Sequence, residues 1–167
     1  MSGSARDEYA RVLAENQRYV EAFDRSSLTA APLSGLAILA CMDARLDVND
    51  ALGLATGDAH VIRNAGGLAT DDAIRSLVIS QQLLGTDEIL VIGHTACGLL
   101  GVDEDALRQR LTAASGKAVD MGFGAFEDLE ASVHRQVARL RTHPWLKPVP
   151  IHGLIFEVET GRIREIE

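Results

Sequence analysis

A short apolar run followed by reactive side chains constrains this chain most strongly. The run is Leu36–Ala40, which follows Gly35 and contains no polar residue. Such a segment is typical of a strand buried on both faces of a parallel sheet. A thiol, a carboxylate and a guanidinium then follow at alternate positions, as Cys41, Asp43 and Arg45. Because ligands bind beyond the carboxyl ends of strands in open α/β sheets, the sequence predicts a functional site here.

A second apolar run ends in the same way. Ile89–Gly93 is followed by His94 and, three residues later, by Cys97. If the two strands are parallel neighbours, two thiols and one imidazole meet at one edge of the sheet. Zinc prefers thiolate and imidazole ligands in tetrahedral geometry, and catalytic sites keep one position for water or substrate. The sequence therefore predicts a zinc site formed by Cys41, His94 and Cys97.

Asp43 and Arg45 are expected to pair, with the guanidinium binding the carboxylate through two hydrogen bonds. Held in this way, Asp43 can orient a zinc-bound hydroxide. Released, it could reach the metal and displace the water, so the pair could act as an orienting group or as an off-switch. Because two thiolates cancel the formal charge of zinc, we expect a weak Lewis acid and activity that rises through alkaline pH.

Each of these residues has a simpler explanation when taken alone. A single buried cysteine is usually a small core residue, and an isolated Asp-x-Arg is usually a weak surface pair. A single histidine is more often hydrogen-bonded in a core than a metal ligand. Their combination at two strand ends makes the functional interpretation the better one. The remaining histidines have no partner motif and are expected to be structural or exposed: His60, His134, His143 and His152.

The rest of the chain predicts one α/β domain over residues 1–167. Helices are expected over residues 5–25, 47–54, 71–84, 103–114 and 126–141, and further strands over residues 60–63, 151–158 and 163–166. Strands that alternate with helices indicate a mostly parallel central sheet flanked by helices. The N-terminal helix is amphipathic and precedes the first strand, so its apolar face is expected to pack on the sheet or on a partner subunit.

Composition and charge limit the possible partners and location. The net charge is -8, which argues against nucleic acid or an anionic membrane as a partner. No apolar stretch approaches the roughly 20 residues of a membrane span, and the first residues lack the apolar segment of a signal peptide. We therefore expect a cytoplasmic protein. In that reducing compartment the 2 cysteines are expected to be metal ligands or free thiols.

Three motifs resemble those of the β-class carbonic anhydrases, in particular the compact branch of the family. They are Cys41-Met42-Asp43-Ala44-Arg45, Arg63-Asn64-Ala65-Gly66 and His94-Thr95-Ala96-Cys97-Gly98. The resemblance implies zinc on Cys41, His94 and Cys97, with Asp43 and Arg45 as a catalytic dyad. It also implies a homodimer or homotetramer in which the N-terminal helix embraces a neighbour. The implied reaction is attack of zinc hydroxide on carbon dioxide, then release of bicarbonate and proton transfer to solvent.

The substrate stays open at this point. Compact members of the family often carry an acidic residue where this chain has Ala96. Some proteins similar to the family hydrolyse carbonyl sulfide or carbon disulfide, which are also linear triatomic molecules with an electrophilic carbon. Discrimination is expected at the pocket mouth, around Leu46, Val48, Ala96 and Leu99. A third alternative is a non-catalytic zinc protein that binds a partner.

Overall fold

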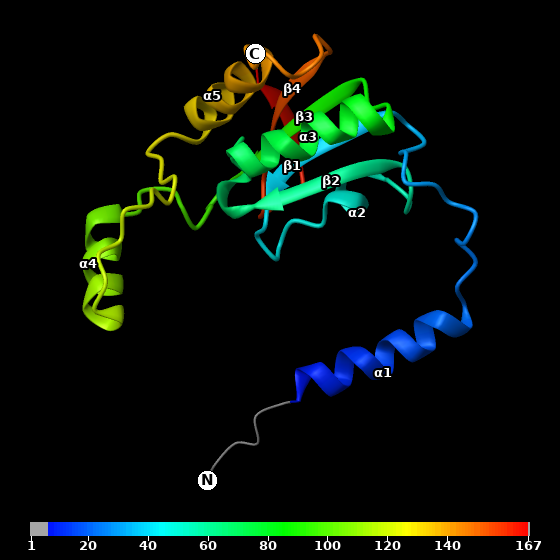
Figure 1. The fold of residues 1–167 in the computed structure, drawn as a ribbon, viewed down its shortest axis with the longest axis horizontal. Coiled ribbons are helices and arrows are strands. Elements are labelled where there is room, and N and C mark those ends of the chain that lie inside the picture. Colours follow the sequence, from blue (N-terminus) through cyan, green and yellow to red (C-terminus); the bar gives the residue numbers. More distant parts are fainter. Residues whose placement is uncertain (1–6, 167) are drawn as a thin grey trace.

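The computed structural model describes residues 7–166, and a five-stranded sheet forms its centre (Figure 1). The strand order is β2-β1-β3-β4-β5. Neighbouring strands are parallel except for β4 and β5, which are antiparallel. The strands are β1 (Leu36–Cys41), β2 (Ala59–Asn64), β3 (Glu88–His94), β4 (Ile151–Phe156) and β5 (Ile163–Ile166). The expected α/β class with a mostly parallel sheet is confirmed.

Five α-helices and one short 3-10 helix complete the described chain: α1 (Glu8–Glu21), α2 (Val48–Leu52), η1 (Ala65–Gly67), α3 (Asp71–Leu84), α4 (Glu104–Ser115) and α5 (Leu129–Arg141). A side-chain oxygen caps the first turn of each α-helix by accepting a backbone N–H bond. The capping residues are Asp7, Asp47, Thr70, Asp103 and Asp128. None of the helices between residues 7 and 166 has the length and apolar character that crossing a bilayer requires.

The alternation of side chains along β1 divides the core into two layers. Ala37 and Leu39 face a cluster that includes residues of α3 and α5, such as Leu77. Ile38 and Ala40 belong to a second cluster on the other face. Both faces of β1 are therefore buried, which explains why its sequence contains no polar residue.

Helices α1 and α4 have no buried residue and extend away from the sheet (Figure 1). Packing of α1 on the sheet, one of the two expected arrangements for its apolar face, is therefore not observed. The helix runs over Glu8–Glu21, shorter than the expected 5–25, and residues 5 and 6 lie outside the described part of the chain.

Two further element bounds differ from expectation for identifiable reasons. Helix α5 begins at Leu129 because Phe126 forms a parallel β-bridge with Leu100. Strand β4 ends at Phe156 because the chain then turns, with the N–H of Gly161 donating to the carbonyl of Glu157.

Candidate metal centre

The parallel pairing of β1 with β3 brings the three expected metal ligands together. Cys41 is the last residue of β1, His94 is the last residue of β3, and Cys97 lies in the turn that follows. Their ligand atoms all lie within 4.8 Å of one another. All three side chains are buried. The group is thus positioned to bind a metal ion.

The hydrogen bonding of His94 leaves one ring nitrogen free for a metal. Nδ1 lies 2.9 Å from the carbonyl oxygen of Thr95. A carbonyl only accepts, so Nδ1 carries the proton and Nε2 presents a lone pair. Nε2 is buried and has no hydrogen-bond partner. Such an unsatisfied atom costs about 1–3 kcal/mol, and a metal bound between two thiols would remove that cost. The donor set matches zinc.

The expected pairing of Asp43 with Arg45 is present beside this group. Arg45 Nε donates to Asp43 Oδ1 at 2.9 Å, and Arg45 Nη2 donates to Asp43 Oδ2 at 2.8 Å. These bonds, with a further one from the Arg45 backbone, hold the pKa of Asp43 well below its usual range. Asp43 Oδ2 also lies 3.8 Å from His94 Nε2, so the carboxylate faces the ring nitrogen that has no hydrogen-bond partner.

Arg45 also reaches the loop that carries Cys97. Its Nη2 atom donates to the carbonyl of Ala96 at 2.9 Å. Ala96 has a φ of 50°, and no other non-glycine residue between residues 7 and 166 has a positive φ. The left-handed conformation costs an alanine about 1–2 kcal/mol. Ala96, which stands where the compact members of the family resembled by the sequence often carry an acidic residue, is therefore in a strained conformation.

Arg63 supports the end of β1, a role that the motif containing it did not reveal. Its Nε atom donates to the Cys41 carbonyl at 2.9 Å, and its Nη2 atom donates to the Asp43 carbonyl at 2.7 Å. Asn64 accepts from the N–H of Leu68 and so holds the turn that follows. Arg63 thus fixes the backbone on both sides of Met42.

Phe126 is a component of the centre that sequence reasoning missed. It is buried and forms one apolar cluster with Cys41 and Cys97. Burial raises the pKa of the Cys97 thiol, and a bound metal would favour its thiolate form. Nothing in the local sequence around Phe126 indicates the role, because its position depends on the pairing with Leu100.

A pocket of about 350 Å³ opens onto the centre. It is lined by Cys41, Met42, Asp43, Ala44, Ala65, Gly66, Cys97, Gly98 and Leu99. Leu99 thus lies where the sequence placed it. Leu46 and Val48 do not: they are buried in the core on one face of the sheet, because the chain turns back after Asp43. Ala96 is not among the lining residues.

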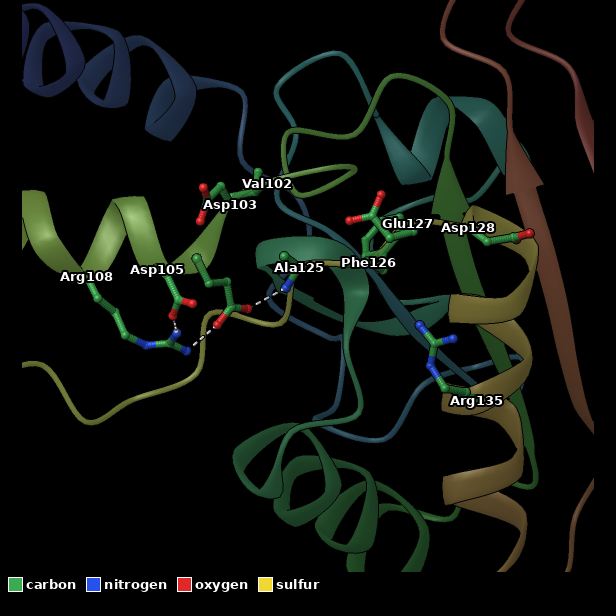
Figure 2. Close-up of a pocket in the computed structure, with 10 residues that line it drawn as sticks. Val102, Asp103, Asp105, Arg108, Ala125, Phe126, Glu127, Asp128 and Arg135 are labelled. Atoms are coloured by element: carbon green, nitrogen blue, oxygen red, sulfur yellow. Dashed lines mark hydrogen bonds and ion pairs between the residues drawn. The ribbon is translucent and has the colours of Figure 1, made fainter.

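A separate pocket of about 580 Å³ lies between the start of α4 and α5 (Figure 2). Its walls are mostly charged and contain none of the three metal-ligand candidates. Within it, Glu104 accepts from the backbone N–H of Ala125 at 2.8 Å. Glu104 therefore fastens the segment that leads into Phe126.

The other histidines lie outside the metal centre. His60 bonds to Ser80 and to the Ala30 carbonyl, and His152 lies between two glutamates. His143 packs edge-on against Trp145, and His134 is exposed.

The fold and the centre define the class of the protein: a parallel α/β metalloprotein with a Cys-His-Cys site at the carboxyl ends of two strands. The family model of carbonic anhydrase matches residues 36–163, and the chain belongs to the β-carbonic anhydrase family. Members of this family are enzymes that use zinc, and the Cys-His-Cys group is positioned to bind that ion.

Named relatives agree with this assignment. β-Carbonic anhydrase 1 of Mycobacterium tuberculosis is 41% identical over 155 residues, which cover 92% of this chain and 94% of that protein. A carbon disulfide hydrolase of Acidithiobacillus thiooxidans is 41% identical over 151 residues, with 76% of this chain and 74% of that protein covered. The crystal structure of carbonic anhydrase from Streptococcus mutans superimposes with a TM-score of 0.91 at 42% identity, and the match covers 100% of both chains.

Proposed function

We propose that this protein hydrates carbon dioxide to bicarbonate, with zinc held by Cys41, His94 and Cys97. The observation that carries the proposal is the bare Nε2 atom of His94, which lies buried between two thiols and faces the Asp43 carboxylate. The similarity to proteins named carbonic anhydrase over nearly the whole chain supports the same reaction.

Asp43 and Arg45 act as the catalytic dyad in this proposal. A bound zinc ion would supply Lewis acidity and so lower the pKa of a water molecule. Asp43 Oδ2, which faces His94 Nε2, would accept a hydrogen bond from that water and orient it toward the substrate. Arg45 fixes the carboxylate in one orientation and keeps it ionised. In this paired arrangement Asp43 is an orienting group, and the off-switch role requires that Arg45 first release it.

The walls of the pocket suit a small uncharged substrate. Met42, Ala44, Ala65 and Leu99 present apolar atoms beside the centre. A linear molecule such as carbon dioxide loses little hydration on entering such a site. Its electrophilic carbon would then lie beside the position where Asp43 would orient a water molecule. Bicarbonate is charged and leaves toward solvent.

The second candidate is hydrolysis of carbonyl sulfide or carbon disulfide with the same residues. It is favoured by the relative named carbon disulfide hydrolase, which matches this chain at 41% identity. The apolar pocket walls accept sulfur as readily as oxygen, so the geometry of the centre serves both reactions.

A side-by-side assay of the zinc-loaded protein at alkaline pH separates these functions. Carbon dioxide hydration is measured by stopped flow, and hydrogen sulfide release is measured from carbonyl sulfide and from carbon disulfide. Fast hydration with little sulfide supports the proposal. Efficient sulfide release with weak hydration moves the function to the second candidate. If neither reaction runs while zinc binds tightly, the protein is a non-catalytic zinc protein and both enzymatic proposals fail.

The amphipathic helix α1 supports a further proposal, that the protein acts as a homodimer or homotetramer. None of its residues is buried, and its exposed side chains include Tyr9, Leu13, Tyr19 and Val20. A second copy of the chain would bury this stripe.

Both cysteines are free thiols, and they can serve as ligands only while reduced. This requirement supports the cytoplasm as the place of action.

A further inference from the structure

The residue after His94 is fastened to the segment that follows β4. The backbone N–H of Thr95 donates to the carbonyl of Phe156 at 2.9 Å. Thr95 Oγ1 accepts from the N–H of Val158 at 3.0 Å and donates to Glu159 Oε2 at 3.0 Å. Three hydrogen bonds therefore fix Thr95 to the end of β4 and the turn that follows it.

The orientation of the His94 ring depends on Thr95. The carbonyl of Thr95 accepts the bond from His94 Nδ1 at 2.9 Å, and this contact determines both the tautomer and the direction of Nε2. The next residue, Ala96, is held in a left-handed conformation and by Arg45. Strained backbone persists only where the surroundings over-determine it. Thr95 supplies that constraint on the His94 side of the strained residue.

We propose that Thr95, anchored by the carboxylate of Glu159, is a positioning residue for the metal ligand His94. The inference rests on the proposed function, because it assumes that His94 binds the metal. The hydroxyl is essential to this role, since it accepts from Val158 and donates to Glu159 at once. Through this contact the turn between β4 and β5 supports the metal centre. Neither Thr95 nor Glu159 touches the reacting atoms.

The test compares Thr95→Val, Thr95→Ser and Glu159→Ala. Zinc affinity is measured by competition with a chelator, and ligand geometry is measured from the visible absorption of the cobalt-substituted protein. Thr95→Val removes both hydroxyl bonds and is expected to weaken zinc binding about tenfold or more and to alter the cobalt spectrum. Glu159→Ala removes one bond and is expected to weaken binding about two- to tenfold. Thr95→Ser keeps the hydroxyl and is expected to restore affinity and spectrum.

The same turn offers a matched control. Thr160 Oγ1 donates to Glu157 Oε2 at 2.8 Å and accepts from the N–H of Arg162 at 3.2 Å. These are the same two kinds of bond that Thr95 makes, but they do not lead to His94. Thr160→Val and Glu157→Ala are therefore expected to leave zinc affinity and the cobalt spectrum unchanged.

The proposal is overturned if folded Thr95→Val binds zinc with the affinity and spectrum of the wild type. It is equally overturned if Thr160→Val weakens binding as much as Thr95→Val does. Should Thr95→Val fail to fold without metal, Glu159→Ala decides the question, because Glu159 is exposed. If the wild type itself binds neither zinc nor cobalt, the proposed function and this inference fail together, an outcome distinct from failure of the inference alone.

Discussion

The guanidinium of Arg45 binds the carboxylate of Asp43 through two bonds and the carbonyl of Ala96 through a third, at distances of 2.8–2.9 Å. Arg45 therefore joins the loop after β1 to the loop after β3. Its side chain is 50% exposed, so the ion pair adds little to stability. We conclude that its main effect is the orientation of Asp43.

Arg45→Lys is expected to lower the rate of carbon dioxide hydration without unfolding the protein. A lysine ammonium cannot match the carboxylate with two parallel bonds and also reach Ala96. Misplacement of Asp43 is expected to reduce kcat about 10²-fold, while the free energy of unfolding changes by less than about 1 kcal/mol. Stopped-flow kinetics and urea unfolding measure the two quantities. Arg75→Lys, which alters an exposed pair with Asp72, is the control. A wild-type kcat in Arg45→Lys would contradict the orienting role.

The sequence predicted the parts of the site that stand next to buried strands. Cys41 and His94 end two apolar runs, so the strand geometry alone places them together. The bidentate pairing of Asp43 with Arg45 followed from their spacing and chemistry. These inferences needed only local pattern and the rule for parallel sheets.

Contacts between distant loops were beyond that reasoning. Phe126 reaches the two cysteines only because its segment pairs with Leu100, and Glu159 reaches Thr95 only because β4 lies beside β3. Leu46 was expected at the pocket mouth but is buried, since the chain reverses at a turn that no glycine or proline marks. Such contacts depend on tertiary structure and leave no periodic signal in the sequence.

The pH dependence of stability is expected to report on Glu104. Backbone N–H groups of Ala125 and Phe123 donate to its carboxylate and lower its pKa below the usual value. A depressed pKa in the folded state stabilises the protein above the unfolded pKa of about 4.3, and this contribution is lost as the pH falls through the folded pKa. Glu104→Gln should therefore destabilise the metal-free protein clearly at pH 6, and by progressively less as the pH falls below about 4.

Urea unfolding midpoints at several pH values measure this difference. Asp105→Asn is the matched control: Asp105 also pairs with Arg108, but its side chain is 86% exposed. A small effect is expected there, because the side chain is largely in solvent. A Glu104→Gln effect that does not change with pH would show that the carboxylate charge is irrelevant to the loop.

Charges on the apolar stripe of α1 are expected to dissociate the oligomer. Leu13 and Val20 lie seven residues apart, so they share one face of the helix, and both are exposed. Leu13→Asp combined with Val20→Asp should lower the molar mass measured by light scattering. The fold of each chain should be retained, because no residue of α1 is buried. Glu15→Lys on the opposite face is the control. An unchanged oligomer in the double variant would exclude α1 as the interface.

Gly67→Ala is expected to destabilise the protein and the metal centre together. Gly67 has a φ of 63°, and a Cβ atom there would lie 3.1 Å from backbone atoms of Ala40, Cys41 and Ile92. Backbone at the ends of β1 and β3 cannot move aside without displacing Cys41. Gly85→Ala is the matched control, since Gly85 has a φ of 80° but open space around it.

In both variants the left-handed conformation strains the new alanine by about 1–2 kcal/mol. The additional loss of folding free energy in Gly67→Ala, relative to Gly85→Ala, therefore measures the crowding alone. We expect an excess of about 1 kcal/mol or more in urea unfolding. Weaker zinc binding is expected in Gly67→Ala only, because the backbone of Cys41 must shift. Equal destabilisation by the two variants would show that the end of β1 yields freely, which is incompatible with a rigid support for the metal ligand.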